Sequence, residues 1–528
     1  MSTDATLSPQ ELAAATGLEY LDLREVEVDL EALAGFPQRL IYRSGLFPIG
    51  YAGSSLRVAT SDPNDLYPLD EASAATGRHV VAVVADRDEI SRLMNQHLGV
   101  GSETIEDLIA AKSEDGDDDI ELLESIQTDG SELGDQAQEA SVVRLVNEIL
   151  VEAVNSRTSD VHIESRGSGL AVRFRIDGIL HTQPTPPEIN RFAAAIISRL
   201  KIMAHLNIAE KRLPQDGRIK LRVKGREVDV RLSVIPMIHG EGLVMRILDK
   251  SSMKFDLQGL GMDPATYERF SHLIGAPHGI VLVTGPTGSG KTTTLYSSLL
   301  QIQSPDTKII TTEDPVEYQL DGVNQIQVHP KIGLTFAASL RAILRHDPDV
   351  VLVGEIRDLE TAENAIQASL TGHLVFSTLH TNDAAGAFTR MCDMGVEPFL
   401  VAGTVEAVMA QRLLRRVCPD CRQAYTPDES ELPGDFPVDR LDGRPLYRSV
   451  GCRECRQVGF RGRMGIYELL EANEAIRELA QNRASSWDIR RAAVAAGMRT
   501  LRMDAWEKTL QGETTVEEVL RVTKGDMS

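Results

Sequence analysis

A glycine-rich loop carries the strongest chemical signal in the chain, Gly285-Pro286-Thr287-Gly288-Ser289-Gly290-Lys291-Thr292. It follows the apolar run 279–283 and precedes a helix-like stretch that begins at Thr293. Glycines let the backbone curl so that several N–H groups point at phosphate, and the helix N-terminus adds partial positive charge. We therefore predict a nucleotide-binding loop rather than an ordinary glycine turn. Lys291 would reach the β- and γ-phosphates, and the Thr292 hydroxyl would bind magnesium.

Two acidic clusters are candidates for positioning the water that attacks a bound triphosphate. Glu313 follows the apolar run 308–311, and Glu355 follows the apolar run 350–353. Ligands of doubly wound sheets collect beyond the carboxyl ends of the strands, so both clusters are expected to face the phosphate loop. We predict that Glu355 orients or deprotonates the water, with Glu313 as the second candidate. For each glutamate the alternative is a solvated surface acid.

A second constellation consists of two Cys-x-x-Cys pairs, Cys418 with Cys421 and Cys452 with Cys455. Four thiolates satisfy the tetrahedral preference of zinc and leave no position for a catalytic water. The spacing predicts a structural zinc site that closes the loop between the pairs, with a redox dithiol as the alternative.

The elements that must position these residues are predicted from short apolar runs that alternate with helical stretches. The runs 280–283, 308–311, 350–353 and 374–378 are typical of buried strands in a doubly wound α/β sheet. This pattern places an ATPase-type domain at 256–528, with a zinc lobe at 415–460 and C-terminal helices at 465–528. Those helices are expected at 476–481, 489–497 and 516–522.

Upstream of this domain, residues 141–255 predict a second α/β domain. Apolar residues recur with helical period near 142–153, and a second helix is expected at 192–206. Alternating polar and apolar residues predict strands at 160–164, 170–176, 219–223 and 227–234.

Residues 1–100 predict a small α/β module that binds a partner. Helices are expected at 7–16 and 87–98, and strands at 39–50, 55–60 and 80–84. Residues 101–140 form an acidic segment, because no Lys or Arg occurs between Ser113 and Val143. Such like charges repel one another, so a flexible linker is predicted, with a specific acidic docking segment as the alternative.

The bulk composition restricts the classes of partner. The net charge of -23 argues against a protein that coats nucleic acid or lies on anionic lipid, so we expect neither nucleic-acid binding nor direct membrane insertion. The polar N-terminus has no signal-peptide pattern, and the apolar runs have strand length. We expect a soluble, cytoplasmic protein whose membrane association comes only through a partner.

Several motifs together resemble the secretion ATPase superfamily, and within it general secretory pathway protein E and the type IV pilus assembly ATPases. The segment 344–358 is similar to the signature of that superfamily, 313–317 to its aspartate box and 371–382 to its histidine box. Segments 159–164 and 214–218 resemble its second N-terminal domain. The resemblance covers about 141–528 and is weaker across the first 110 residues.

This resemblance implies a P-loop RecA-like ATPase domain preceded by a PAS-like α/β domain and a small N-terminal module. It implies a homohexamer that uses ATP, Mg²⁺ and Zn²⁺. Arg218 and Arg231 match positions expected to touch phosphates, with surface ion pairs as the alternative, and His380 matches the γ-phosphate-sensing histidine. Gly354 stands where other P-loop enzymes carry a magnesium-binding aspartate, as it does in this family.

The expected function is a motor ATPase that powers type II protein secretion by pseudopilus assembly. Type IV pilus extension is the alternative within the family, and a nucleic-acid translocase is a distant one. The resemblance implies that the N-terminal module contacts the cytoplasmic domain of an inner-membrane platform protein.

Overall fold

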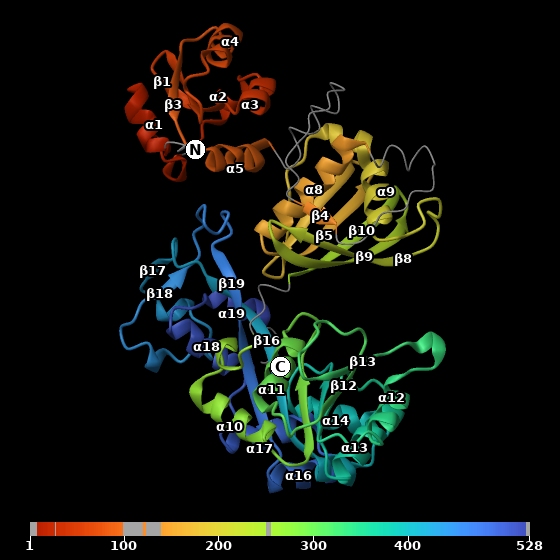
Figure 1. Cartoon of the computed structure of the whole chain (residues 1–528). Helices are drawn as coiled ribbons and strands as arrows, with labels where there is room; N and C mark the ends of the chain where they lie inside the picture. The colour runs from red at the N-terminus through yellow and green to blue at the C-terminus, as the bar shows by residue number, and fades with distance from the viewer. Residues whose placement is uncertain (1–7, 27, 99–119, 123–138, 250–254, 524–528) are drawn as a thin grey trace. The chain divides into compact units, whose positions relative to one another are not determined.

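The structure of the chain is a computed structural model that describes residues 8–26, 28–98, 120–122, 139–249 and 255–523 (Figure 1). Its internal contacts divide the chain into two compact units, Met1–Met253 and Lys254–Ser528. Among the described residues, none of the helices combines the length and the apolar character needed to cross a bilayer.

The N-terminal part of the first unit is a small three-stranded sheet in the order β1-β2-β3 with helices around it. Three elements have the predicted bounds: β2 (Ser55–Thr60), β3 (Val80–Val84) and α5 (Arg87–Leu98). The remaining elements are α1 (Pro9–Thr16), α2 (Leu30–Ala34), α3 (Gln38–Ser44), α4 (Leu66–Thr76) and β1 (Phe47–Ala52).

The strand predicted at 39–50 is partly wrong, because α3 occupies its first half and β1 starts only at Phe47. Leu40 and Ile41 are both fully buried. Consecutive buried residues do not fit a strand with one apolar face, whereas a helix can turn both towards the core. Gly45 ends the helix in the left-handed region, with φ of 59°.

The rest of the first unit is a seven-stranded sheet in the order β4-β8-β9-β10-β5-β6-β7, and every adjacent pair is antiparallel. Helices α8 (Ala140–Asn155) and α9 (Ala193–Met203) pack with the apolar face of this sheet into one core. The strands are β4 (Ile120–Leu122), β5 (Thr158–Arg166), β6 (Gly169–Ile176), β7 (Ile179–Thr182), β8 (Gln215–Val223), β9 (Arg226–Met237) and β10 (Gly240–Asp249).

The predicted acidic linker lies mostly outside the described residues. Its one described internal stretch, β4, pairs with β8, where Ile120 faces Val223 and Leu122 faces Leu221. That stretch is therefore an edge strand rather than free linker.

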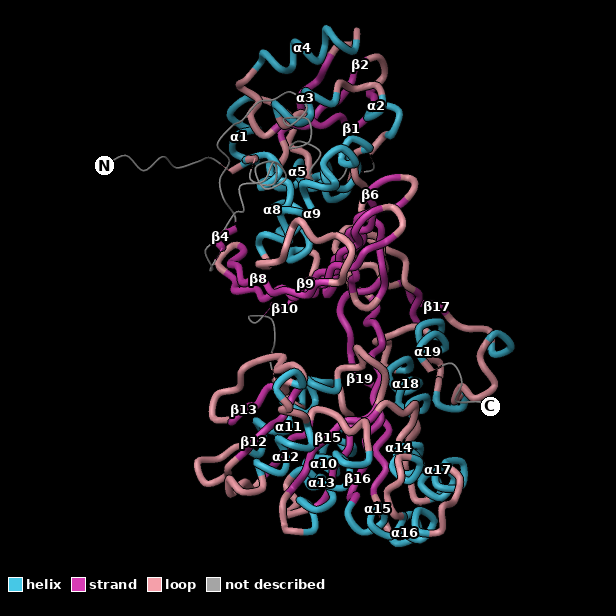
Figure 2. Tube along the Cα trace, turned by 90° about the vertical axis from the view of Figure 1, so that its right-hand side faces the viewer, coloured by secondary structure: helices cyan, strands magenta, loops and turns pink. Residues whose placement is uncertain are grey.

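The second unit contains a seven-stranded sheet in the order β13-β12-β14-β15-β11-β16-β19, and only β19 runs antiparallel to its neighbour. Alternate residues of β11 (Gly279–Thr284) enter two separate cores. Ile280 and Leu282 face one, whereas Val281 and Val283 face the other. Helices cover both faces (Figure 2), so the predicted doubly wound P-loop sheet is confirmed.

The parallel strands end at one edge of this sheet, where the site residues lie. Besides β11, the parallel strands are β12 (Ile309–Glu313), β13 (Asn324–Gln327), β14 (Val350–Val353), β15 (Leu374–Leu379) and β16 (Val405–Val417). The antiparallel strand β19 (Phe460–Glu471) lies at the border of the sheet. Strands β17 (Gln423–Tyr425) and β18 (Leu446–Arg448) form a separate two-stranded sheet. The long β16–β19 pair, plain in Figure 1, was not predicted from the sequence.

Helices α10 (Pro264–Ile274) and α11 (Lys291–Ile302) contribute to one core of this unit, and α12 (Phe336–Ile343), α13 (Leu359–Leu370), α14 (Ala385–Asp393) and α15 (Pro398–Thr404) contribute to the other. The C-terminal helices are α16 (Glu474–Gln481), α17 (Ser486–Ala495), α18 (Leu501–Leu510) and α19 (Val516–Val522). The sequence predicted three of these four, and α18 was missed.

Candidate active site

The predicted phosphate loop connects β11 to α11 and is built around its glycines. Gly285 has φ of 146° and Gly290 has φ of 90°, a conformation that L side chains rarely adopt. A Cβ atom on Gly285 would lie 2.5 Å from the carbonyl oxygen of Gln411. The Ser289 hydroxyl is buried and has no hydrogen-bond partner among the residues that the structure describes. These features fit a loop whose backbone approaches a phosphate closely.

Lys291 begins α11, and its ammonium group turns back onto the loop. Its Nζ atom donates to the carbonyl oxygens of Gly285 at 2.7 Å and Pro286 at 3.1 Å. Thr292 is exposed in the first helical turn, and Thr293 is half-buried beside it. The residues present therefore fit a triphosphate, with Thr292 available to a magnesium ion.

Glu355 and His380 come together at this edge of the sheet. Glu355 follows β14 and His380 follows β15, and the Nε2 atom of His380 lies 3.3 Å from Oε2 of Glu355. Arg357 lies 2.5 Å from Oε1 of the same carboxylate, whose side chain is 12% exposed. The carboxylate is thus held from two sides.

Charges around Lys291 tie these residues to the phosphate loop. Burial lowers the pKa of Lys291, the Glu355 carboxylate raises it and the Arg412 guanidinium lowers it, with a net pKa of about 8. Lys291, at the start of α11, therefore lies within electrostatic reach of Glu355, which follows β14. An ammonium group with this pKa is still mainly charged at neutral pH.

Glu313 occupies the predicted end of β12 but faces a buried hydrogen-bond network. Its carboxylate accepts hydrogen bonds from the Tyr296 hydroxyl, from Thr311 Oγ1 at 2.5 Å and from Gln325 Nε2 at 3.1 Å. Burial raises the pKa of Tyr296, and the Glu313 charge adds to that rise. This environment suits a residue that positions β12 and α11, and a catalytic role for Glu313 stays a prediction.

Gly354, at the position where other P-loop enzymes carry an aspartate, is closely packed. A Cβ atom there would lie 3.2 Å from the carbonyl oxygen of Thr312 and 3.3 Å from Cα of Glu313. A side chain does not fit without movement of the β12 backbone. The packing thus gives a physical reason for glycine at this position.

Arg218 and Arg231 are cross-strand partners on β8 and β9. The row continues through Arg246 on β10, Asp160 on β5 and Arg175 on β6. Arg218 Nε donates to Asp229 at 2.7 Å, and Arg246 Nε donates to Asp160 at 3.1 Å. The two predicted arginines thus belong to a basic row of the first unit, and their contact with phosphate stays a prediction.

The four predicted cysteines converge as the spacing required. All four Sγ atoms lie within 4.8 Å of one another, and the Cys418–Cys452 and Cys421–Cys455 distances are 3.9 Å and 3.7 Å. A tetrahedral zinc site with bonds of about 2.3 Å requires sulfur–sulfur distances of about 3.8 Å. Backbone N–H groups of Cys452 and Gly459 donate to Cys455 Sγ. The cluster fits zinc.

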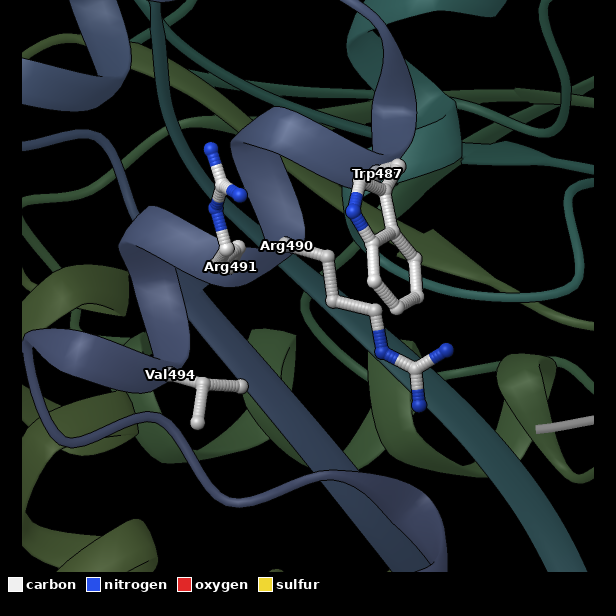
Figure 3. Close-up of a pocket in the computed structure, with 4 residues that line it drawn as sticks. All are labelled: Trp487, Arg490, Arg491 and Val494. Atoms are coloured by element: carbon white, nitrogen blue, oxygen red, sulfur yellow. The ribbon is translucent and has the colours of Figure 1, made fainter. Parts of the chain in front are cut away.

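A cavity with a different lining lies on α17 (Figure 3). Trp487, Arg490, Arg491 and Val494 line it, and Arg490 extends alongside the Trp487 ring. It holds none of the predicted site residues.

Three residues beside the phosphate loop were missed by the sequence prediction. Gln411 Oε1 accepts a hydrogen bond from Thr294 Oγ1 at 2.8 Å, and Arg412 donates to the Asn382 carbonyl oxygen at 3.0 Å. Gln411 and Arg412 lie on β16, whose parallel pairing with β11 brings them to the loop. Asn382 belongs to the histidine-box segment, so the motif itself offered a signal for that residue.

Comparisons with known proteins agree with this geometry. The family described as Type II/IV secretion system protein matches residues 135–521, and the MshEN domain matches residues 16–104. The type IV pilus assembly ATPase PilB of Myxococcus xanthus is 43% identical over 518 residues, 98% of this chain and 90% of that protein. Type II secretion system protein E of Xanthomonas campestris pv. campestris is 45% identical over 524 residues, 97% of this chain and 89% of that protein.

Among solved structures, the ATPase DotB of Legionella pneumophila matches with a TM-score of 0.52 and 21% identity. The match covers 71% of this chain and 94% of that one, and it supports the fold alone. With the phosphate loop, the strand-end glutamate and these relatives together, the chain belongs to the Type II/IV secretion system protein family and is an ATP hydrolase.

Proposed function

We propose that this chain is the cytoplasmic, hexameric motor ATPase that powers type II protein secretion through pseudopilus assembly. The observation that carries the proposal is the convergence of Lys291, Glu355 and His380 at one edge of the P-loop sheet. Relatives named type II secretion system protein E support the secretion assignment. The relative named PilB supports type IV pilus extension as the second candidate.

In this proposal each residue of the site has a task in ATP hydrolysis. The loop amides and Lys291 hold the β- and γ-phosphates, since positive charge must balance the transferred phosphoryl group. Magnesium bound through Thr292 and the phosphates would neutralise developing charge between them. Glu355 orients the attacking water and accepts its proton, while His380 and Arg357 fix the direction of the carboxylate.

In this proposal, assembly of the chain into a hexamer completes the nucleotide site. The basic row that contains Arg218 and Arg231 supplies guanidinium groups, which match phosphate geometry well. The N-terminal module binds the cytoplasmic domain of an inner-membrane platform protein, so the chain reaches the membrane through partners. Zinc at the cysteine cluster has a structural role only, because four thiolates fill its coordination.

The test measures ATP hydrolysis by the purified full chain, alone, with the cytoplasmic domain of the platform protein, and with single-stranded DNA. Lys291→Ala is expected to abolish turnover, whereas Lys331→Ala, at an exposed lysine of the same unit, retains it. Stimulation by the platform domain supports the proposal. Stimulation by DNA alone would point to the translocase, and full turnover in the Lys291 variant would refute the site.

Disruption of the gene distinguishes the two secretion-type functions. Type II secretion predicts that exported proteins accumulate inside the cell while surface pili persist. Loss of pili with normal export would assign the chain to pilus extension instead.

A further inference from the structure

The segment that contains His380 is fastened to several strands of the sheet. Thr381 N–H donates to Thr284 Oγ1 at 2.8 Å, immediately before the phosphate loop. Ala384 N–H donates to Glu468 Oε1 at 2.9 Å, on β19. Residues 380–384, here called the histidine segment, thus join the strand ends around the nucleotide site.

Arg412 provides a further attachment of the histidine segment. Its Nη2 atom donates to the Asn382 carbonyl oxygen at 3.0 Å and lies 3.4 Å from Oδ1 of the same residue. Its Nη1 atom donates to the Gln411 carbonyl oxygen at 3.4 Å and is 3.1 Å from the position that a Cβ atom on Gly285 would occupy. The guanidinium therefore lies beside the first glycine of the loop and hydrogen-bonds the histidine segment.

We propose that Arg412 is a positioning residue for ATP hydrolysis, which fastens the histidine segment to the phosphate loop so that His380 keeps Glu355 directed at the reacting phosphate. The inference rests on ATP hydrolysis at the proposed site and adds a residue to it. Arg412 acts through Asn382 and His380, and its role is to hold geometry.

Two physical arguments support this role. A guanidinium is planar and has donors on two sides, so Arg412 can donate to Asn382 and to the Gln411 carbonyl oxygen beside the loop in one fixed geometry, whereas a lysine ammonium is a point charge without that fork. A displacement of about 1 Å in a catalytic group can cost about 100-fold in rate. Loss of the Arg412 hydrogen bond removes one restraint on Asn382, which is two residues from His380. We therefore expect kcat to fall more than KM changes.

A second effect of Arg412 is electrostatic and gives an independent readout. The charged groups that act on Lys291 are Glu355, after β14, and Arg412, on β16. Because a neighbouring cation lowers the pKa of Lys291, removal of that cation raises it. Nucleotide affinity is expected to weaken as Lys291 loses its proton above about pH 8, and without Arg412 the weakening begins at higher pH.

The experiment compares Arg412→Gln and Arg412→Lys in the full chain with Arg416→Gln. Arg416 is an exposed arginine on the same strand, 3.5 Å from Glu513. Turnover is measured with ATP, and affinity is measured with a fluorescent ATP analogue between pH 7 and pH 9.5. We expect Arg412→Gln to lower kcat about 10- to 100-fold with KM changed less than about threefold.

The pH arm separates positioning from general damage to the fold. Arg412→Gln is expected to move the loss of affinity to higher pH, whereas Arg412→Lys keeps the charge and the wild-type pH profile but still loses turnover. Wild-type kcat in Arg412→Gln overturns the inference while leaving ATP hydrolysis intact. A loss equal to that of Arg416→Gln, with an unchanged pH profile, also overturns it. A wild-type chain that neither binds nor hydrolyses ATP overturns the proposed function as well.

Discussion

The Nε2 atom of His380 lies 3.3 Å from Oε2 of Glu355, which joins the end of β15 to the end of β14. The two residues are 25 positions apart in the chain, and parallel pairing of the two strands brings them together. The carboxylate that we propose acts on water therefore has His380 as a direct neighbour. In the proposed mechanism, this contact links phosphate sensing by His380 to water activation by Glu355.

Replacement of Glu355 by Gln is expected to lower kcat about 100-fold or more while ATP still binds, because the amide cannot accept a proton. His380→Gln keeps a side chain able to hydrogen-bond Glu355, so its loss is expected to be smaller. Steady-state turnover and equilibrium nucleotide binding measure the two effects. Equal turnover in the wild type and Glu355→Gln would remove Glu355 from the mechanism.

Local patterns in the sequence were sufficient for several elements of the unit that carries the phosphate loop. The bounds of β14 and α19 agree with the predicted ones, because continuous apolar runs or helical periodicity identify them without tertiary information. The four cysteines were also predictable, since their spacing constrains the metal geometry directly. Each of these signals is confined to a few neighbouring residues.

Non-local pairing explains what the sequence did not predict. Strands β16 and β19 form one antiparallel pair although the zinc lobe separates them in the chain, and nothing near residue 412 marks it as adjacent to Gly285. That proximity follows from the parallel pairing of β16 with β11. Similarly, the burial of both Leu40 and Ile41 is a property of the packed module.

The cysteine cluster is expected to bind about one zinc ion per chain and to close the β16–β19 pair. Strand β16 ends at Val417, directly before Cys418, and β19 begins five residues after Cys455. Cys418→Ser is expected to lose the zinc and lower the melting temperature. Cys392→Ser, at the cysteine outside the cluster, serves as the matched control. Elemental analysis and thermal unfolding test both statements, and undiminished zinc in Cys418→Ser would contradict the assignment.

Gly354 is expected to tolerate no side chain without cost. Gly354→Ala places a Cβ atom 3.2 Å from the Thr312 carbonyl oxygen, so we expect a loss of about 1–3 kcal/mol in the free energy of unfolding. Gly403→Ala adds a Cβ atom with no neighbour within 4 Å, on α15, and is expected to be neutral or slightly stabilising. Urea denaturation measures the free energy of unfolding of both variants. Equal values would show that the β12 backbone moves to accept the added Cβ atom at little cost.

Glu468 is a buried carboxyl that links the histidine segment to the C-terminal helices. Oε1 accepts from Ala384 N–H at 2.9 Å, and Oε2 accepts from Leu501 N–H at 3.3 Å. Burial, together with the Asp383 charge, raises the pKa of Glu468 to about 7. Between about pH 4.5 and pH 7, the Glu468 carboxyl therefore keeps its proton in the folded chain, whereas in the unfolded chain, where its pKa is the ordinary 4.5, it has lost the proton.

A carboxyl with a raised pKa makes the folded state lose stability as pH increases, because the unfolded state binds fewer protons. The free energy of unfolding of the second unit is expected to fall by on the order of 3 kcal/mol between about pH 4.5 and pH 7 through this group. Both tryptophans, Trp487 and Trp506, lie in that unit, so their fluorescence in urea reports its unfolding. Glu468→Gln cannot titrate and is expected to remove this part of the pH dependence, whereas parallel pH profiles in both proteins would show that Glu468 is ionised when folded.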